Sequence, residues 1–215
     1  MSVSVLAVLV SALLAFQDPA AVPEQESQPE QADKTVERVT FSRGKKKVPL
    51  FMELTRANPD PMTPMLVLFH QARSSKGEYR PIVPHLRELG YNCLAVDLSF
   101  GGICREVKNQ TARAAPNATA LDSADDMLDA LRWARANHAQ GKLLAWGSSF
   151  SASLALVLAA QHAELVEGVI AFSPGEYFAA EGKSASWVQE SVATLRQPVF
   201  VAAARAEERD WKALF

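Results

Sequence analysis

The chain has 215 residues, which is enough for about one domain and a tail. Hydrophobic residues make up 48% of it and charged residues 21%, a composition typical of a soluble globular protein with a sizeable core. The formal net charge of −2 at pH 7 removes the electrostatic reason to expect a nucleic acid or an anionic membrane as a partner.

The N-terminal segment has features of a targeting sequence. Val3 to Phe16 is an unbroken run of apolar or small residues, too short for a comfortable membrane span, and no basic residue precedes it. We expect residues 1–17 to be a signal peptide that directs the protein to the periplasm or out of the cell, with an uncleaved N-terminal anchor as the alternative. Residues 18–34 are rich in Pro, Glu and Gln and should form a disordered linker. One folded domain then spans residues 35–215.

Within this domain, strand patterns alternate with helix patterns. Strands are predicted over Val36–Phe41, Val48–Leu54, Met65–Phe69, Tyr91–Leu98, Leu143–Trp146, Leu165–Phe172 and Gln197–Ala204. Helices are predicted over Gly77–Gly90, Ala120–Ala139, the apolar residues up to His162, and Ser184–Leu195, while Ile103–Thr119 reads as irregular and polar. Such alternation implies crossover connections. The expected fold class is therefore α/β, a mostly parallel sheet with helices on both faces.

The stretch Lys142–His162 combines a short apolar strand, a tight turn and an apolar helix. The turn reads Gly147-Ser148-Ser149-Phe150-Ser151, and a serine at a sharp corner between strand and helix has the geometry of a nucleophile elbow. Residues two before and two after the apex must be small, because strand and helix nearly collide there. Gly147 and Ser151 meet this requirement when Ser149 is the apex.

Two other serines of this turn compete for the apex. Ser148 would place Trp146 and Phe150 at the crowded positions, which sterics disfavour. Ser151 has small neighbours but lies too far beyond the apolar strand. Ser149 is therefore the candidate nucleophile. An ordinary Gly/Ser loop leading into a helix stays an alternative at this point, because the last position of the turn holds Ser instead of the more usual Gly.

Other loops with polar residues also follow the ends of predicted strands, where functional groups collect in parallel sheets. They carry His70-Gln71-Ala72, Asp97–Gly102 and the acidic residues after the last strand. Together with the elbow, these residues resemble the α/β-hydrolase superfamily, in particular its dienelactone-hydrolase-like and small serine esterase branches. The resemblance covers Leu66 to Glu208 and implies an α/β-hydrolase fold without its last helix-strand-helix portion.

The resemblance also implies roles for individual residues. Ser149 would be the nucleophile, and the backbone N–H groups of Ala72 and Phe150 would form the oxyanion hole. The family's acid falls on Glu207, with Glu208 adjacent, and such a carboxylate orients a catalytic histidine. Plain surface solvation is the alternative for this Glu pair. Dienelactone hydrolases themselves use a Cys nucleophile, and neither cysteine here lies at an elbow, which favours a serine esterase.

The histidines of the chain do not complete this arrangement. His70 precedes the oxyanion loop and is expected to be structural, and His85, His138 and His162 lie within or at the ends of predicted helices. The family's histidine should follow the acid by one further helix and strand, yet no histidine follows His162. We expect either a C-terminally incomplete hydrolase or a degenerate relative. In both cases the 215 residues alone should have little or no activity.

The sequence thus predicts a serine hydrolase of ester, lactone or related acyl bonds that works through an acyl-enzyme on Ser149. The alternative is a non-catalytic binding protein of the same fold. The expected partner is a small-molecule ester or lactone, with no nucleic acid, and with stable membrane association only if the N-terminal segment is uncleaved. No cofactor or metal is implied, since Cys93 and Cys104 lack metal-type spacing. For these two cysteines, free thiols and a disulfide both stay open.

Overall fold

The computed structural model describes residues 36–42 and 48–215. The predicted signal peptide or anchor (1–17), the linker (18–34) and most of the basic turn before β2 lie outside the described residues. The strands are β1 (Val36–Phe41), β2 (Leu50–Thr55), β3 (Met65–Phe69), β4 (Asn92–Val96), β5 (Ile103–Cys104), β6 (Val107–Lys108), β7 (Leu143–Ser148), β8 (Gly168–Phe172) and β9 (Val199–Ala202). The helices are η1 (Lys76–Tyr79), α2 (Val83–Glu88), α3 (Gln110–Ala114), α4 (Ser123–Asn137), α5 (Phe150–Gln161), η2 (Ala179–Glu181), α6 (Trp187–Val192), η3 (Arg205–Glu207) and α7 (Glu208–Lys212), the η elements being 3₁₀ helices.

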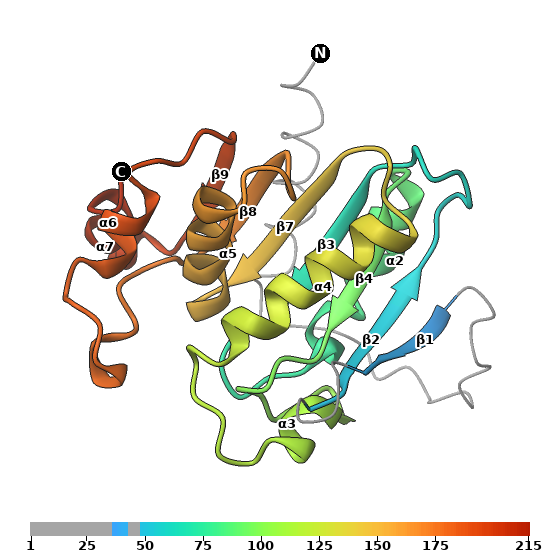
Figure 1. The fold of residues 1–215 in the computed structure, drawn as a ribbon, viewed down its shortest axis with the longest axis horizontal. Coiled ribbons are helices and arrows are strands. Elements are labelled where there is room, and N and C mark those ends of the chain that lie inside the picture. Colours follow the sequence, from blue (N-terminus) through green and yellow to red (C-terminus); the bar gives the residue numbers. More distant parts are fainter. Residues whose placement is uncertain (1–35, 43–47) are drawn as a thin grey trace, which may run out of the picture. The chain divides into compact units, whose positions relative to one another are not determined.

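The main sheet of the described chain has seven strands in the order β1-β2-β4-β3-β7-β8-β9 (Figure 1). β1, β2 and β4 pair antiparallel, whereas β4, β3, β7, β8 and β9 pair parallel. The carboxyl ends of β3, β7 and β8 are in register, because Phe69 pairs with Gly147 and Ser148 pairs with Phe172. The loops that follow these strands therefore begin side by side at one edge of the sheet.

Helices cover both faces of this sheet. α4 and α5 lie in front of it in Figure 1, and their buried residues share one cluster with Met65, Val67 and Phe69, which alternate along β3. Leu66 and Leu68 are equally buried and point to the other face, where η1 contacts β3 and α2 contacts β4. Burial on both faces explains the continuous apolar run of β3. The predicted α/β class is confirmed.

The prediction of one continuous helix over Gly77–Gly90 is wrong, because the structure has two separate helices there, η1 and α2. Pro81 lies between the two pieces and has no N–H to donate to a carbonyl one turn earlier, while Pro84 is tolerated in the first turn of α2. Tyr79, the last residue of η1, is buried, and its hydroxyl donates to the carbonyl oxygen of Phe69 at 2.6 Å. η1 is thereby tied to the end of β3.

The segment Ile103–Thr119 was predicted to be irregular, and this prediction is wrong. The segment contains the β5–β6 hairpin and α3. Arg105 and Glu106 form the hairpin turn with φ values of 46° and 63°, the left-handed conformation that the tightest hairpin turns require. Asn109 begins α3 by accepting the N–H of Ala112 at 2.7 Å. Elements this short leave no periodic pattern in the sequence, which is why the prediction missed them.

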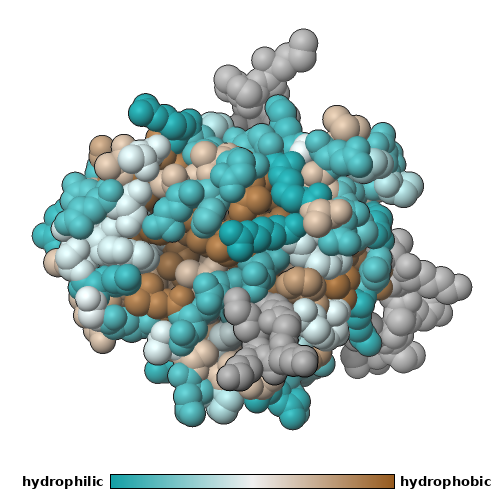
Figure 2. All heavy atoms as spheres, viewed as in Figure 1, coloured by the Kyte–Doolittle hydropathy of each residue, from teal (hydrophilic) through white to brown (hydrophobic). Residues whose placement is uncertain are grey.

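The other predicted elements are present but mostly shorter. Helix Ala120–Ala139 is observed as Ser123–Asn137, and Ser184–Leu195 as Trp187–Val192. None of the helices in the described part of the chain is long and apolar enough to cross a membrane. Figure 2 shows the face that carries α4 and α5, where polar residues dominate and apolar residues are visible in the hollows between them.

Candidate active site

Ser149 is the single residue between β7 and α5, and it occupies a strained backbone conformation. Its φ is 58° and its ψ is −126°. For a residue with a side chain, such a conformation costs about 1–3 kcal/mol and persists only where the surroundings impose it. The N–H of Ser149 donates to Phe172 at 2.8 Å, and its carbonyl accepts from Ala152 at 2.9 Å. The structure thus places Ser149 at the apex of a strand–turn–helix corner, and its role as a nucleophile stays a prediction.

Strand and helix approach each other closely around this apex. A Cβ added to Gly147 would lie 2.5 Å from the backbone N and Cα of Ala152, closer than real Cβ atoms come. Ser151, on the other side of the apex, is fully buried. The size requirement that the sequence analysis places on these two positions therefore has a direct steric basis in the structure.

Ser151 also anchors the elbow to the neighbouring strand. Its hydroxyl donates to the carbonyl oxygen of Phe69 at 2.8 Å and accepts the N–H of Ser148 at 2.9 Å. Phe69 is the last residue of β3, so the bond joins the two strand ends whose loops carry the predicted oxyanion donors. A glycine at this position would leave the Ser148 N–H without this acceptor.

The two predicted oxyanion donors follow the neighbouring strands β3 and β7. The N–H groups of Ala72 and Phe150 donate no hydrogen bond within residues 36–42 and 48–215. Ala72 is exposed and Phe150 is buried, with its ring against Phe100. Two uncommitted backbone donors beside a serine are what an oxyanion hole requires. The assignment of these residues to that role stays a prediction.

Of the two candidate acids, Glu207 faces the neighbouring strand end and Glu208 faces solvent. Glu207 Oε2 accepts the hydroxyl of Ser173 at 2.7 Å and the N–H of Ala204 at 3.1 Å. Glu208 forms an ion pair with Lys212, whose hydrogen bond and charge lower the pKa of the Glu208 carboxyl. The structure therefore brings Glu207, and not Glu208, toward the loop that follows β8.

Tyr177 interacts with both Ser149 and Glu207, a placement that the sequence did not reveal. Its hydroxyl donates to the carbonyl oxygen of Ser173 at 2.7 Å. Burial raises the pKa of Tyr177, a hydrogen bond with Ser149 lowers it, and the charges of Glu207 and Asp210 raise it. The sequence carries no signal for this contact, because Tyr177 and Ser149 meet through the pairing of β7 with β8.

His70 is locked into the loops around it. It is fully buried, with Nδ1 2.7 Å from the carbonyl oxygen of Gln71 and Nε2 2.9 Å from the N–H of Leu98. These bonds assign the proton to Nδ1 and leave Nε2 as an acceptor. Burial lowers the pKa of His70 to about 4, so the ring is neutral near pH 7. This agrees with the structural role expected from the sequence.

The remaining histidines lie on or beside helices. His162 caps the C-terminus of α5, and the 12 residues of that helix separate it from Ser149. At a rise of about 1.5 Å per residue, this corresponds to roughly 18 Å along the helix. His138 follows α4 and contacts Arg56 at 3.3 Å, and the side chain of His85 on α2 is 54% exposed.

Both cysteines are free, Cys93 being buried and Cys104 partly buried.

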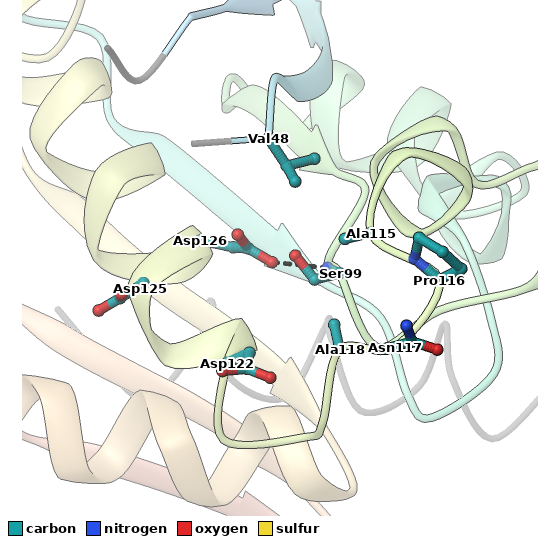
Figure 3. A pocket seen from close by; sticks show the side chains of 9 residues that line it. All are labelled: Val48, Ser99, Ala115, Pro116, Asn117, Ala118, Asp122, Asp125 and Asp126. Atoms are coloured by element: carbon teal, nitrogen blue, oxygen red, sulfur yellow. Dashed lines mark hydrogen bonds between the residues drawn. The ribbon is translucent and has the colours of Figure 1, made fainter. Parts of the chain in front are cut away.

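A hollow of about 370 Å³, lined by no residue of the elbow, lies between the start of α4 and the loop after α3 (Figure 3). The side chains that line it are Val48, Ser99, Ala115, Pro116, Asn117, Ala118, Asp122, Asp125 and Asp126. Asp126 accepts the N–H of Ser99 at 2.6 Å, as drawn in Figure 3. In the described part of the chain, no group of three or more His, Cys, Asp or Glu side chains could hold a metal ion.

A family model described as alpha/beta hydrolase fold matches residues 64–207. Among solved structures, the chain is similar to a dienelactone hydrolase from Anabaena variabilis, with 18% identity, a TM-score of 0.60, and coverage of 83% of this chain and 78% of that one. It is also similar to the Pyrococcus furiosus esterase Pf2001, with 18% identity, a TM-score of 0.62, and coverage of 84% and 76%. Est1E from Butyrivibrio proteoclasticus aligns with 16% identity, a TM-score of 0.56, and coverage of 77% and 76%. A search of curated proteins finds no match.

Proposed function

Because the chain belongs to the alpha/beta hydrolase fold family, we propose that it is a serine hydrolase of ester, lactone or related acyl bonds. The observation that carries this proposal is the backbone of Ser149, held at φ 58° between β7 and α5. Such strain is maintained against a cost of about 1–3 kcal/mol, and it turns the serine side chain out of the strand and helix that flank it.

In the proposed reaction, the hydroxyl oxygen of Ser149 attacks the carbonyl carbon of the substrate. A new C–O bond forms, and the carbonyl oxygen becomes an oxyanion that the N–H groups of Ala72 and Phe150 stabilise. The bond between the carbonyl carbon and the alcohol oxygen then breaks, and the alcohol receives the proton that the base took from Ser149. An acyl-enzyme remains on Ser149, with the alcohol still tethered in the case of a lactone, and water hydrolyses it to the acid. Donors of this kind are worth about 2.7–4 kcal/mol each when they are removed from known enzymes.

A general base must take the proton of the Ser149 hydroxyl, and Glu207 is proposed to orient and charge-stabilise that base. The bond from the Ser173 hydroxyl to Glu207, at 2.7 Å, supports a carboxylate held at the correct edge of the sheet. His70 is not assigned as the base, since both of its ring nitrogens are engaged. The base is not assigned to any of residues 1–215.

The proposed substrate is a small-molecule ester or lactone. The similarity of the chain to a dienelactone hydrolase and to an esterase supports this class. No cofactor is part of the proposal.

A periplasmic or secreted location is proposed from the apolar run Val3–Phe16. Mass spectrometry tests it by identifying the N-terminal residue of the mature protein in each cell fraction.

The test of the catalytic proposal is covalent labelling of the full-length protein by a fluorophosphonate probe, together with hydrolysis of p-nitrophenyl butyrate and of a simple lactone. We expect one label per chain on Ser149, lost in Ser149→Ala and retained in the control Ser191→Ala, whose hydroxyl donates to the Trp187 carbonyl within α6. Labelling that persists in Ser149→Ala would refute the assignment. No labelling and no turnover in the full-length protein would favour the non-catalytic binding protein.

A further inference from the structure

Glu78 is a partly buried carboxylate that contacts both halves of the candidate active site. It lies on η1, and its Oε2 accepts the N–H of Gln71 at 3.0 Å. Its carboxyl also contacts the hydroxyl of Ser148, the residue immediately before Ser149. Gln71 immediately precedes Ala72, one of the two candidate oxyanion donors. One side chain therefore bridges the loop after β3 and the elbow after β7.

The surroundings of Glu78 are unusual for a surface glutamate. Burial raises the pKa of Glu78, while the hydroxyls of Ser74 and Ser148, the N–H of Gln71 and the charge of Arg105 in the β5–β6 turn lower it. Ser74 Oγ is itself buried and has no hydrogen bond of ordinary geometry among the described residues. A carboxyl group is thus kept in a costly position, in contact with the loop after β3 and with the end of β7.

Hydrogen bonds to the N–H and to the C=O of Gln71 orient the two peptide groups on either side of this residue. A peptide group is planar, so its C=O and the following N–H point in opposite directions. His70 Nδ1 holds the carbonyl of Gln71, which aims the N–H of Ala72 away from His70. Glu78 holds the N–H of Gln71, which fixes the preceding peptide group. Two consecutive peptides are thereby set by two side chains.

We propose that Glu78 is a positioning residue for the oxyanion hole. Its carboxylate fixes the Gln71 peptide against Ser148 and so sets the separation of the Ala72 and Phe150 N–H groups. The inference rests on the proposed function, because it assigns these two groups to the oxyanion. A residue with this role affects the transition state more than the bound substrate, since the oxyanion exists only during the reaction.

In full-length protein that hydrolyses p-nitrophenyl butyrate, the test compares Glu78→Leu, which removes the acceptor, with Glu78→Gln, which keeps one. We expect Glu78→Leu to lower kcat about 100-fold with KM unchanged within about twofold, because small misplacements of catalytic groups have effects of this size. Glu78→Gln should recover kcat to within about fivefold of the natural protein. Glu88→Leu, an exposed glutamate on α2, is the matched control and should leave both constants unchanged. The proposal would be overturned if kcat of Glu78→Leu equalled that of the natural protein. It would also be overturned if KM rose by the same factor by which kcat fell.

Amide hydrogen exchange supplies a readout that does not require activity. Exchange at Gln71 should accelerate in Glu78→Leu and stay natural in Glu88→Leu, and unchanged exchange in Glu78→Leu would contradict the proposed tie. If Glu78→Leu does not fold, Ser148→Ala can be used instead, because it removes the other end of the contact. We expect Ser148→Ala to lower kcat about fivefold. An unchanged kcat in Ser148→Ala would count against the proposal. Failure of the natural protein to react with a fluorophosphonate would refute the proposed function instead, while the exchange result would still decide whether Glu78 holds the loop.

Discussion

The hydroxyl of Ser151 in α5 donates to the carbonyl oxygen of Phe69 at the end of β3, 2.8 Å away, although 82 residues separate them in the chain. The same carbonyl accepts the Tyr79 hydroxyl at 2.6 Å, so both of its lone pairs are used. This carbonyl therefore joins η1 and α5 to the central strand, directly beneath the loops that carry Ala72 and Ser149.

Replacing Ser151 by Ala should destabilise the protein through this junction. The buried hydroxyl would be lost, and the N–H of Ser148 would lose its acceptor, at a cost of about 1–3 kcal/mol. Urea unfolding followed by circular dichroism measures the change. Ser191→Ala, which removes a hydroxyl from α6, is the control and should cost less than about 0.5 kcal/mol. Equal stability of the two variants would show that the junction contributes nothing specific.

Gly147→Ala should separate the strand and helix of the elbow. The new Cβ would meet backbone atoms of Ala152 at 2.5 Å, and the backbone cannot move aside as a flexible side chain can. We expect a loss of about 2 kcal/mol or more in the free energy of unfolding and loss of fluorophosphonate labelling. Gly90→Asn is the control, because nothing lies near the position that a Cβ would take and Asn tolerates its φ of 89°. A folded, normally labelled Gly147→Ala would contradict the close contact.

His70 should make stability fall as the pH is lowered below about 6.5. Its folded pKa is about 4 against 6.5 for a free ring: burial is the largest cause and lowers it, the charge of Lys76 also lowers it, and the Gln71 carbonyl and the charge of Asp97 raise it. The unfolded chain therefore binds a proton first, and the stability present above pH 6.5 is lost as the pH falls toward 4, by up to about 3 kcal/mol.

Unfolding free energies of the natural protein and of His70→Asn at pH 8, 6, 5 and 4 measure this contribution. The difference between the two proteins should shrink as the pH falls. A constant difference between the natural protein and His70→Asn would exclude the proposed titration.

The two cysteines should differ in reactivity. Burial raises the pKa of Cys93 to about 12, so almost no thiolate exists at pH 8, whereas Cys104 is only partly buried. A thiol reagent such as DTNB should modify Cys104 in the folded protein. Under the same conditions Cys93 should react at least about 100-fold more slowly, because its modification requires unfolding. Cys104→Ser should therefore abolish the fast phase, and a fast phase that survives in this variant would refute the difference.

Several predictions from sequence rested on contacts between residues that are close in the chain. The requirement for small residues around Ser149 follows from the crossing of one strand with the helix that follows it, and Gly147 and Ser151 both occupy such positions. The apolar runs of β3 and β4 likewise indicated a sheet buried on both faces. The β5–β6 hairpin and α3 were missed because two-residue strands and a five-residue helix carry no periodic signal.

The sequence by itself thus determined the α/β sheet and the corner at Ser149, since local sterics and hydrophobic periodicity are written in neighbouring residues. Only the tertiary structure decided that Glu207, and not Glu208, meets Ser173, and that Glu78 lies against Gln71 and the elbow. These contacts arise from the order in which β3, β7, β8 and β9 pair, and strand order depends on long-range hydrogen bonds that no local pattern encodes.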